Sequence, residues 1–135
     1  MDKYLQYVQK IIMHPETKIL VIDDNIDPTQ IIRLVLTVEG YEVRVCNGLE
    51  EGLYCLYDWK PQILLLDVNI DGEDSRSFCQ KVKAEKHEAI KVILMSGDES
   101  TLDYNEWTDA DDCIAKPFDS DLLLQKISVH ITQKV

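Results

Sequence analysis

The chain has 135 residues, of which 45% are hydrophobic and 29% are charged. This is enough for one domain with an ordinary globular composition, which excludes a collagen, a disulfide scaffold and a disordered chain. Acidic residues outnumber basic ones by 25 to 14, and the resulting net charge of -11 disfavours contact with nucleic acid or anionic lipid. We therefore predict neither direct nucleic acid binding nor membrane association.

Residues 1–17 predict an extension before the main domain. A short amphipathic helix, ended by Pro15, is indicated by apolar residues at helical spacing, namely Tyr4, Leu5, Val8, Ile11 and Ile12. Charged and polar residues interrupt this segment, so it is not a signal peptide, and no apolar run has the length of a membrane span. We expect the protein to be cytoplasmic.

From residue 18 to 135, short apolar runs alternate with segments of helical periodicity. The apolar runs predict five strands, at 19–22, 41–45, 63–66, 92–95 and 113–115. Helices are predicted at 29–40, 48–59, 75–86, 101–107 and from 119 nearly to the end. The alternation predicts an α/β domain with a doubly wound parallel sheet, because continuous apolar strands indicate helices on both faces.

Reactive side chains stand at the ends of four of these strands: Asp23 and Asp24, then Asp67, Ser96 and Lys116. Parallel strands bring their carboxyl ends to one edge, so we expect these groups to meet. Three adjacent carboxylates repel one another unless a cation lies among them, and a hard divalent ion such as Mg²⁺ fits best. Beside that ion, Asp67 would attack a phosphoryl group while Lys116 and the Ser96 hydroxyl offset its charge.

Four motifs in order resemble those of the receiver domain of two-component response regulators. They are ILVIDDN at 19–25, ILLLDVN at 63–69, VILMSG at 92–97 and CIAKPF at 113–118. The separations of 43 residues from Asp24 to Asp67, 29 more to Ser96 and 20 more to Lys116 are close to the usual spacing in that family. The resemblance covers about residues 18–133 and implies a flavodoxin-like fold with strand order 2-1-3-4-5 and five flanking helices.

The resemblance also implies a metal site. Asp67 and Asp24 would ligate Mg²⁺, or Mn²⁺ in its place, together with the backbone carbonyl of Asn69. Asp23 would act from outside the direct ligands, through a water or a neighbouring ligand. In the same comparison, Asn69 and Asp98 stand at positions that set the lifetime of the phosphate.

The implied reaction is phosphorylation of Asp67 by a sensor histidine kinase or a phosphotransfer protein, with the domain catalysing its own phosphorylation and dephosphorylation. Ser96 would be the switch hydroxyl, Lys116 would contact the phosphate, and the peptide bond to Pro117 would be cis. The signal would pass to a downstream protein target through the fourth helix, the fifth strand and the fifth helix. We expect a monomer, or a weak dimer linked to phosphorylation.

Three positions depart from the family pattern. Asp71 stands where a proline is common after the acceptor, and Ser75 stands where a glycine is common. Cys113 occupies the place of the aromatic residue whose rotation reports phosphorylation, and a thiol cannot fill that volume. These departures keep open a second reading, an interaction module with a weakened or absent phospho-switch.

Taken singly, each site residue has an ordinary explanation. Aspartates are favoured at turns and helix caps, and a lone lysine is usually a surface residue. The functional interpretation is favoured because all of them fall at the carboxyl ends of predicted strands. A phosphatase of the haloacid dehalogenase type, which also forms an aspartyl phosphate, would need an aspartate where this chain has Asn69.

The remaining candidate ligands are scattered along the chain. The cysteines lack paired spacing and lie in apolar runs, which predicts buried thiols rather than bridges or zinc; they are Cys46, Cys55, Cys79 and Cys113. The histidines lie in separate elements and are predicted to be surface residues: His14, His87 and His130.

Overall fold

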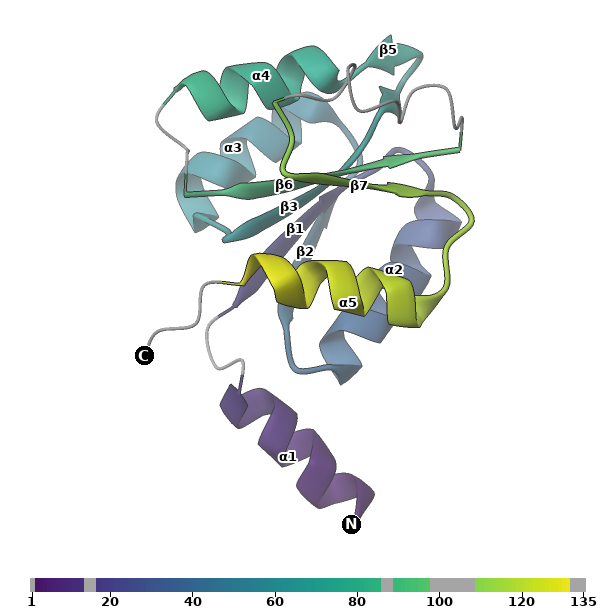
Figure 1. The fold of residues 1–135 in the computed structure, drawn as a ribbon. Helices are drawn as coiled ribbons and strands as arrows, with labels where there is room; N and C mark the ends of the chain where they lie inside the picture. The colour runs from purple at the N-terminus through teal and green to yellow at the C-terminus, as the bar shows by residue number, and fades with distance from the viewer. Residues whose placement is uncertain (1, 14–16, 86–88, 98–108, 132–135) are drawn as a thin grey trace.

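The structure is a computed structural model that describes residues 2–13, 17–85, 89–97 and 109–131. Its main feature is a five-stranded parallel sheet of β1 (Lys18–Ile22), β2 (Glu42–Cys46), β3 (Ile63–Asp67), β6 (Lys91–Ser96) and β7 (Asp112–Ala115). The strands lie in the order β2-β1-β3-β6-β7 (Figure 1). This confirms the predicted order 2-1-3-4-5 and the flavodoxin-like α/β fold.

Helices cover both faces of the sheet (Figure 1). One face carries α3 (Leu49–Trp59) and α4 (Arg76–Ala84), and the other carries α2 (Ile26–Val38) and α5 (Ser120–His130). These are four of the five predicted flanking helices. The fifth, predicted at 101–107, lies outside the described residues.

The core consists of two apolar layers separated by the sheet. Leu20, Leu64 and Leu66 belong to the layer under α3 and α4, while Val21 and Leu65 belong to the layer under α2 and α5. All five side chains are fully buried. Successive strand residues point to opposite faces, so a strand covered on both sides must be apolar throughout. This explains the continuous apolar runs of the sequence.

Helix α2 begins earlier than the sequence predicts. Its first residue is Ile26, so Pro28 lies in the first turn, where a missing backbone N–H breaks no helical hydrogen bond. The Thr29 hydroxyl donates to the Ile26 carbonyl at 2.6 Å. Proline therefore stands inside the helix here rather than before it.

Residues ahead of the sheet form helix α1 (Lys3–Met13), which Figure 1 draws apart from the sheet. Pro15, the predicted end of this helix, lies outside the described residues. Across the residues that the structure describes, no helix is both long and apolar enough to cross a membrane.

Candidate functional site

The ends of β1 and β3 bring three carboxylates together. The two strands are neighbours and their ladder closes with Ile22 opposite Leu66, so Asp23, Asp24 and Asp67 follow side by side. One carboxylate oxygen from each lies within 4.8 Å of the others. Asp23 is fully buried, whereas Asp24 is exposed. The carboxylate cluster is thus open to solvent at Asp24 and closed to it at Asp23.

Lys116 reaches this carboxylate cluster from the end of β7. Its Nζ lies 2.7 Å from Oδ2 of Asp23 and 2.9 Å from Oδ2 of Asp67. The peptide bond between Lys116 and Pro117 is cis, the isomer that the resemblance implies. One ammonium therefore faces two carboxylates, and the four side chains together keep a net negative charge.

Ser96 is held at the same edge by backbone hydrogen bonds. It is the last residue of β6, and its carbonyl accepts the backbone N–H of Lys116 at 2.7 Å. The preceding residue, Met95, pairs with Asp67 in the β3–β6 ladder. Ser96 is 5% exposed. Ser96 thus lies on the strand between β3, which carries Asp67, and β7, which precedes Lys116.

Burial and neighbouring charges shift the pKa values of Asp67 and Lys116. Burial raises the pKa of Asp67 above 3.8, and the charge of Asp23 adds to this, although Lys116 and the Asn69 amide act in the opposite direction. Burial alone would lower the pKa of Lys116, but its hydrogen bonds to Asp23 and Asp67 outweigh burial and raise it. Lys116 therefore stays charged, while for Asp67 its contact with Lys116 does not fully offset burial and the charge of Asp23.

The donor set fits a small divalent ion. Mg²⁺ binds oxygens at about 2.0–2.1 Å, so ligands on opposite sides of one ion are roughly 4 Å apart. The three oxygens of the carboxylate cluster lie within 4.8 Å of one another, so they are close enough together to face one such ion. The exposed side of Asp24 leaves room for the waters that Mg²⁺ usually keeps.

A small hairpin follows β3, and the sequence analysis missed it. It pairs β4 (Asn69–Ile70) with β5 (Glu73–Asp74) in antiparallel fashion. The two residues between them, Asp71 and Gly72, have φ values of 53° and 79°. Aspartate followed by glycine is a strong hairpin signal, because both central residues of a type I′ turn need positive φ. The Asp71–Gly72 dipeptide could therefore have predicted this hairpin from the sequence.

The hairpin contacts the carboxylate cluster directly. The backbone N–H of Asp71 donates to Oδ2 of Asp24 at 2.9 Å, and the N–H of Asn69 donates to Oδ1 of Asp67 at 3.2 Å. These bonds hold one oxygen of each carboxylate from the loop side. The proline that is common at this position in the resembled family could not make the first of them, because proline has no backbone N–H.

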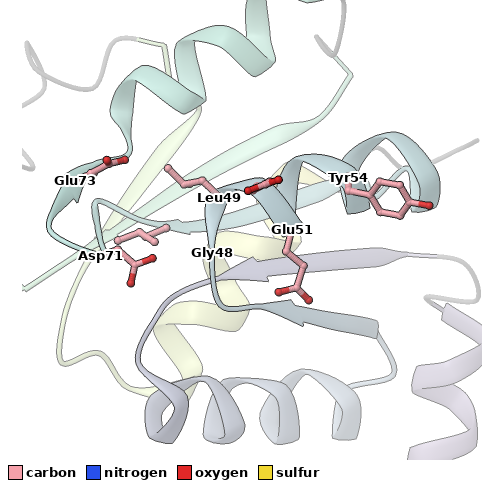
Figure 2. A pocket seen from close by; sticks show the side chains of 8 residues that line it. Gly48, Leu49, Glu51, Tyr54, Asp71 and Glu73 are labelled. Carbon is pink, nitrogen blue, oxygen red and sulfur yellow. The ribbon is translucent and has the colours of Figure 1, made fainter.

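An acidic pocket of about 760 Å³ lies beside the hairpin (Figure 2). Its walls come from the hairpin and from the start of α3, and they comprise Gly48, Leu49, Glu50, Glu51, Tyr54, Ile70, Asp71 and Glu73. The residues of the carboxylate cluster are not among them. The pocket and the carboxylate cluster are therefore neighbouring features connected through Asp71.

Comparison with known proteins decides the family. A family model described as the response regulator receiver domain matches residues 19–128. The chain belongs to this family. The matched region begins in β1 and ends within α5, so it contains every strand end described above.

Solved structures agree with this assignment. The receiver resembles a protein described as a response regulator from Chloroflexus aurantiacus J-10-fl, with a TM-score of 0.78 and 28% identity over 85% of this chain and 97% of that one. It also resembles the receiver domain of NtrX from Brucella abortus, with a TM-score of 0.76 and 27% identity over 83% and 96% of the two chains. TrrA from Thermotoga maritima, solved in complex with Mg²⁺-BeF, shares the fold with a TM-score of 0.78 and 23% identity over 85% and 99%.

A cluster of polar side chains that the sequence analysis did not predict links α5 to β7, with Asp112 at its centre. His130 was predicted to be a surface residue, and this is wrong: its side chain is only 16% exposed, and its Nε2 lies 3.0 Å from Oδ2 of Asp112. Lys126 donates to the other oxygen, Oδ1, also at 3.0 Å. Sequence spacing within α5 gave no sign of Asp112, which lies on another element. His14 and His87 lie outside the described residues.

Cys113 follows directly after this group. Its backbone N–H donates to Oδ1 of Asp112 at 2.8 Å, and its side chain is half-buried against the core layer under α3 and α4. Burial, and then the charge of Asp112, raise the pKa of the Cys113 thiol. The position of the usual aromatic residue is thus filled by a small, un-ionised side chain.

The other three cysteines are buried and all four are free. This confirms the prediction for Cys46, Cys55 and Cys79, and corrects it for Cys113, which is only partly covered. Burial raises the pKa of Cys79 to about 11, and burial with the nearby Cys55 raises that of Cys46 to about 12. Asp98, which the resemblance linked to the phosphate lifetime, lies outside the described residues.

Proposed function

We propose that this receiver accepts a phosphoryl group on Asp67 from the phosphohistidine of a sensor histidine kinase or a phosphotransfer protein. The observation that carries the proposal is the convergence of Asp23, Asp24 and Asp67 with the ammonium of Lys116. Buried acids with a shared cation and a raised pKa are typical of a site with a chemical task.

In the proposed reaction, a carboxylate oxygen of Asp67 attacks phosphorus and forms a P–O bond. The P–N bond to the donor imidazole breaks, and its electron pair stays on the departing nitrogen of the imidazole. Asp67 needs its ionised form for this step, since only the carboxylate has the required nucleophilicity. The product is an aspartyl phosphate, whose three non-bridging phosphoryl oxygens share up to two negative charges.

Each neighbour of Asp67 has a definite part. Lys116, 2.9 Å from Oδ2, offsets charge on the phosphoryl oxygens, and the Ser96 hydroxyl donates to one of them. The N–H of Asn69, which now contacts Oδ1, orients the carboxylate. These groups are fixed before the donor arrives, which is the arrangement that stabilises a transition state most effectively.

Asp24, Asp67 and the backbone carbonyl of Asn69 would hold Mg²⁺ or Mn²⁺, with Asp23 acting from outside the direct ligands. When bound, the metal neutralises charge on the transferring phosphoryl oxygens. The proposal is supported by the oxygen spacing of the carboxylate cluster. The Mg²⁺-BeF complex of TrrA, a relative in fold, is in keeping with it.

The surface next to the acceptor suits docking of a donor protein. Four large apolar side chains of α2 are exposed: Ile26, Ile31, Leu34 and Val38. A groove of about 470 Å³ runs from this helix to residues 116–118 and includes Lys116 itself. Because Lys116 contacts Asp67, a donor seated in the groove would have its phosphohistidine near the acceptor. We propose α2 and this groove as the donor surface.

The output would pass through β7 and α5 to a downstream protein, with residues 18–135 acting as the receiver domain and residues 1–17 as an extension. The predicted setting is the cytoplasm, as a monomer or a weak phosphorylation-linked dimer. Asn69 and Asp98 would tune the lifetime of the phosphate.

A second candidate is favoured by Cys113. A half-buried thiol next to the fixed Asp112 leaves no ring to rotate into the core, so the domain would bind its partner in both phosphorylation states. The phosphatase interpretation has no comparable support, because Asn69 cannot transfer a proton.

Incorporation of phosphate from phosphoramidate tests the proposal. Wild-type protein should take up one phosphoryl group with Mg²⁺ and almost none with a chelator. Asp67→Asn should take up none, whereas Asp71→Asn is the matched control, because its side chain lies outside the carboxylate cluster and its backbone N–H is kept. Equal incorporation into wild type and Asp67→Asn would contradict it.

A further inference from the structure

Ser75, where the family commonly has glycine, is a buried polar residue beside the acceptor. It lies directly before α4 and has no exposed surface. Its Oγ donates to the backbone carbonyl of Asp67, and its own N–H donates to the carbonyl of Val68 at 2.7 Å. One residue thus binds two consecutive carbonyls of the acceptor segment.

An ordinary helix cap does not explain this hydroxyl. Serine is a favoured N-cap because its oxygen accepts a hydrogen bond from the first turn of the helix. Ser75 occupies the N-cap position of α4 but makes no such side-chain bond. Its hydroxyl is directed away from the helix and toward the end of β3.

The backbone carbonyl of Asp67, at the end of β3, needs a hydrogen-bond donor from outside the β1–β3 ladder. The β1–β3 ladder ends with Ile22 and Leu66, one residue before Asp67. Beyond that point the Asp67 carbonyl accepts from the Ser75 side chain rather than from a ladder N–H of a paired β1 residue. A glycine at position 75 would keep the backbone bond to Val68 but would leave this carbonyl without its hydroxyl donor.

The same segment is fixed at its other side. Asp71, at the tip of the hairpin, donates its N–H to Asp24 at 2.9 Å. Residues 67–75 are therefore fastened to the acceptor backbone at one end and to the second carboxylate in the middle. Asn69, whose carbonyl is a proposed metal ligand, lies between the two attachments.

We propose that Ser75 is a positioning residue, which fixes the backbone of Asp67 and Asn69 so that the acceptor carboxylate and the metal-binding carbonyl are already in place. This inference rests on the proposed function. Partners that orient metal ligands typically change affinity or activity by about 10- to 100-fold when removed. Ser75 would act in this way through the main chain, without touching metal or phosphate.

The experiment compares Ser75→Ala and Ser75→Gly with wild type. Both remove the hydroxyl, and the second restores the residue common in the family, which guards against a variant that fails to fold. Ser77→Ala is the matched control, since Ser77 is exposed on the same helix and makes only a 3.4 Å contact to Asp74. The three measurements are Mg²⁺ affinity by isothermal titration calorimetry, the phosphorylation rate at saturating Mg²⁺, and thermal unfolding.

We expect Ser75→Ala and Ser75→Gly to bind Mg²⁺ about tenfold more weakly and to phosphorylate more slowly at saturating Mg²⁺, while Ser77→Ala matches wild type. Folded variants with wild-type Mg²⁺ affinity and rate would overturn the inference, even if they unfold at lower temperature. If wild type binds Mg²⁺ but takes up no phosphate, the proposed function fails, and the affinity comparison still decides the role of Ser75.

Discussion

The ammonium of Lys116 lies 2.7 Å from Oδ2 of Asp23, a carboxylate with no exposed surface, although 93 residues separate them in the sequence. The same ammonium lies 2.9 Å from Asp67. A buried carboxylate that loses a close cationic contact is costly, because the desolvated charge remains. This contact therefore links the stability of the sheet edge to the proposed chemistry.

Lys116→Met should lower the free energy of unfolding in a chelator by about 3–5 kcal/mol, because it leaves Asp23 buried without its ammonium. Mg²⁺ should recover part of the loss by neutralising the carboxylate cluster. Urea denaturation with and without Mg²⁺ measures both effects.

The control for this prediction is Lys126→Met. Lys126 pairs with Asp112, but both side chains keep more than a fifth of their surface exposed, so the loss should be about 1 kcal/mol or less. Equal losses for the two lysines would show that Asp23 does not depend on Lys116.

Mg²⁺ alone should stabilise the folded protein. A ligand at about 100 times its dissociation constant adds about 2.7 kcal/mol when it binds only the folded state. Asp24→Asn should abolish most of this gain, because it removes one of the three clustered carboxylates. Thermal unfolding against Mg²⁺ concentration gives the measurement. Asp71→Asn should behave as wild type, and an unchanged response of Asp24→Asn would argue against the metal site.

The pH dependence of stability should carry the signature of Asp67. Burial, with the charge of Asp23, raises its pKa above the ordinary 3.8, so the folded protein holds this proton more tightly than the unfolded chain. The free energy of unfolding contributed by Asp67 therefore falls as pH rises from 3.8 through the raised folded value. Urea denaturation in a chelator should show this fall in wild type but not in Asp67→Asn. Identical profiles would contradict the raised pKa.

Gly52→Ala should destabilise the domain. A Cβ at position 52 would lie 2.3 Å from Cδ1 and 3.0 Å from Cγ1 of Ile22, a fully buried residue on β1. Overpacking costs about 1–3 kcal/mol, which exceeds the gain of about 1 kcal/mol in helix propensity. Chemical denaturation measures the loss. Gly48→Ala, with no atom within 4 Å of its added Cβ, should change stability less, and the reverse order would refute the packing argument.

The sheet and its reactive edge were predictable because both depend on local sequence. Four apolar residues from Ile63 to Leu66 require cover on both faces, and parallel strands bring their carboxyl ends together. The same logic placed Asp67, Ser96 and Lys116 at one edge. The strand order itself came from the resemblance, since no pairing preference in the apolar runs fixes it.

What could not be predicted depends on where single side chains point. In the sequence, Ser75 is only the first residue of a predicted helix, and the three-dimensional structure shows that its hydroxyl donates to the Asp67 carbonyl. His130 reads as a surface residue because its partner, Asp112, belongs to a different element. The Asp71–Gly72 turn had a usable signal in its dipeptide, but the sequence analysis treated Asp71 only as a departure from the family pattern.

The most direct measurement is to locate the phosphoryl group. Protein phosphorylated by phosphoramidate in Mg²⁺ can be reduced with borohydride, which converts an aspartyl phosphate to homoserine, and its peptides can then be read by mass spectrometry. We predict homoserine at position 67 alone, and none when the metal is chelated. An unmodified residue 67 in protein that carries phosphate, or modification at Asp23 or Asp24 instead, would contradict the assignment of Asp67 as the acceptor.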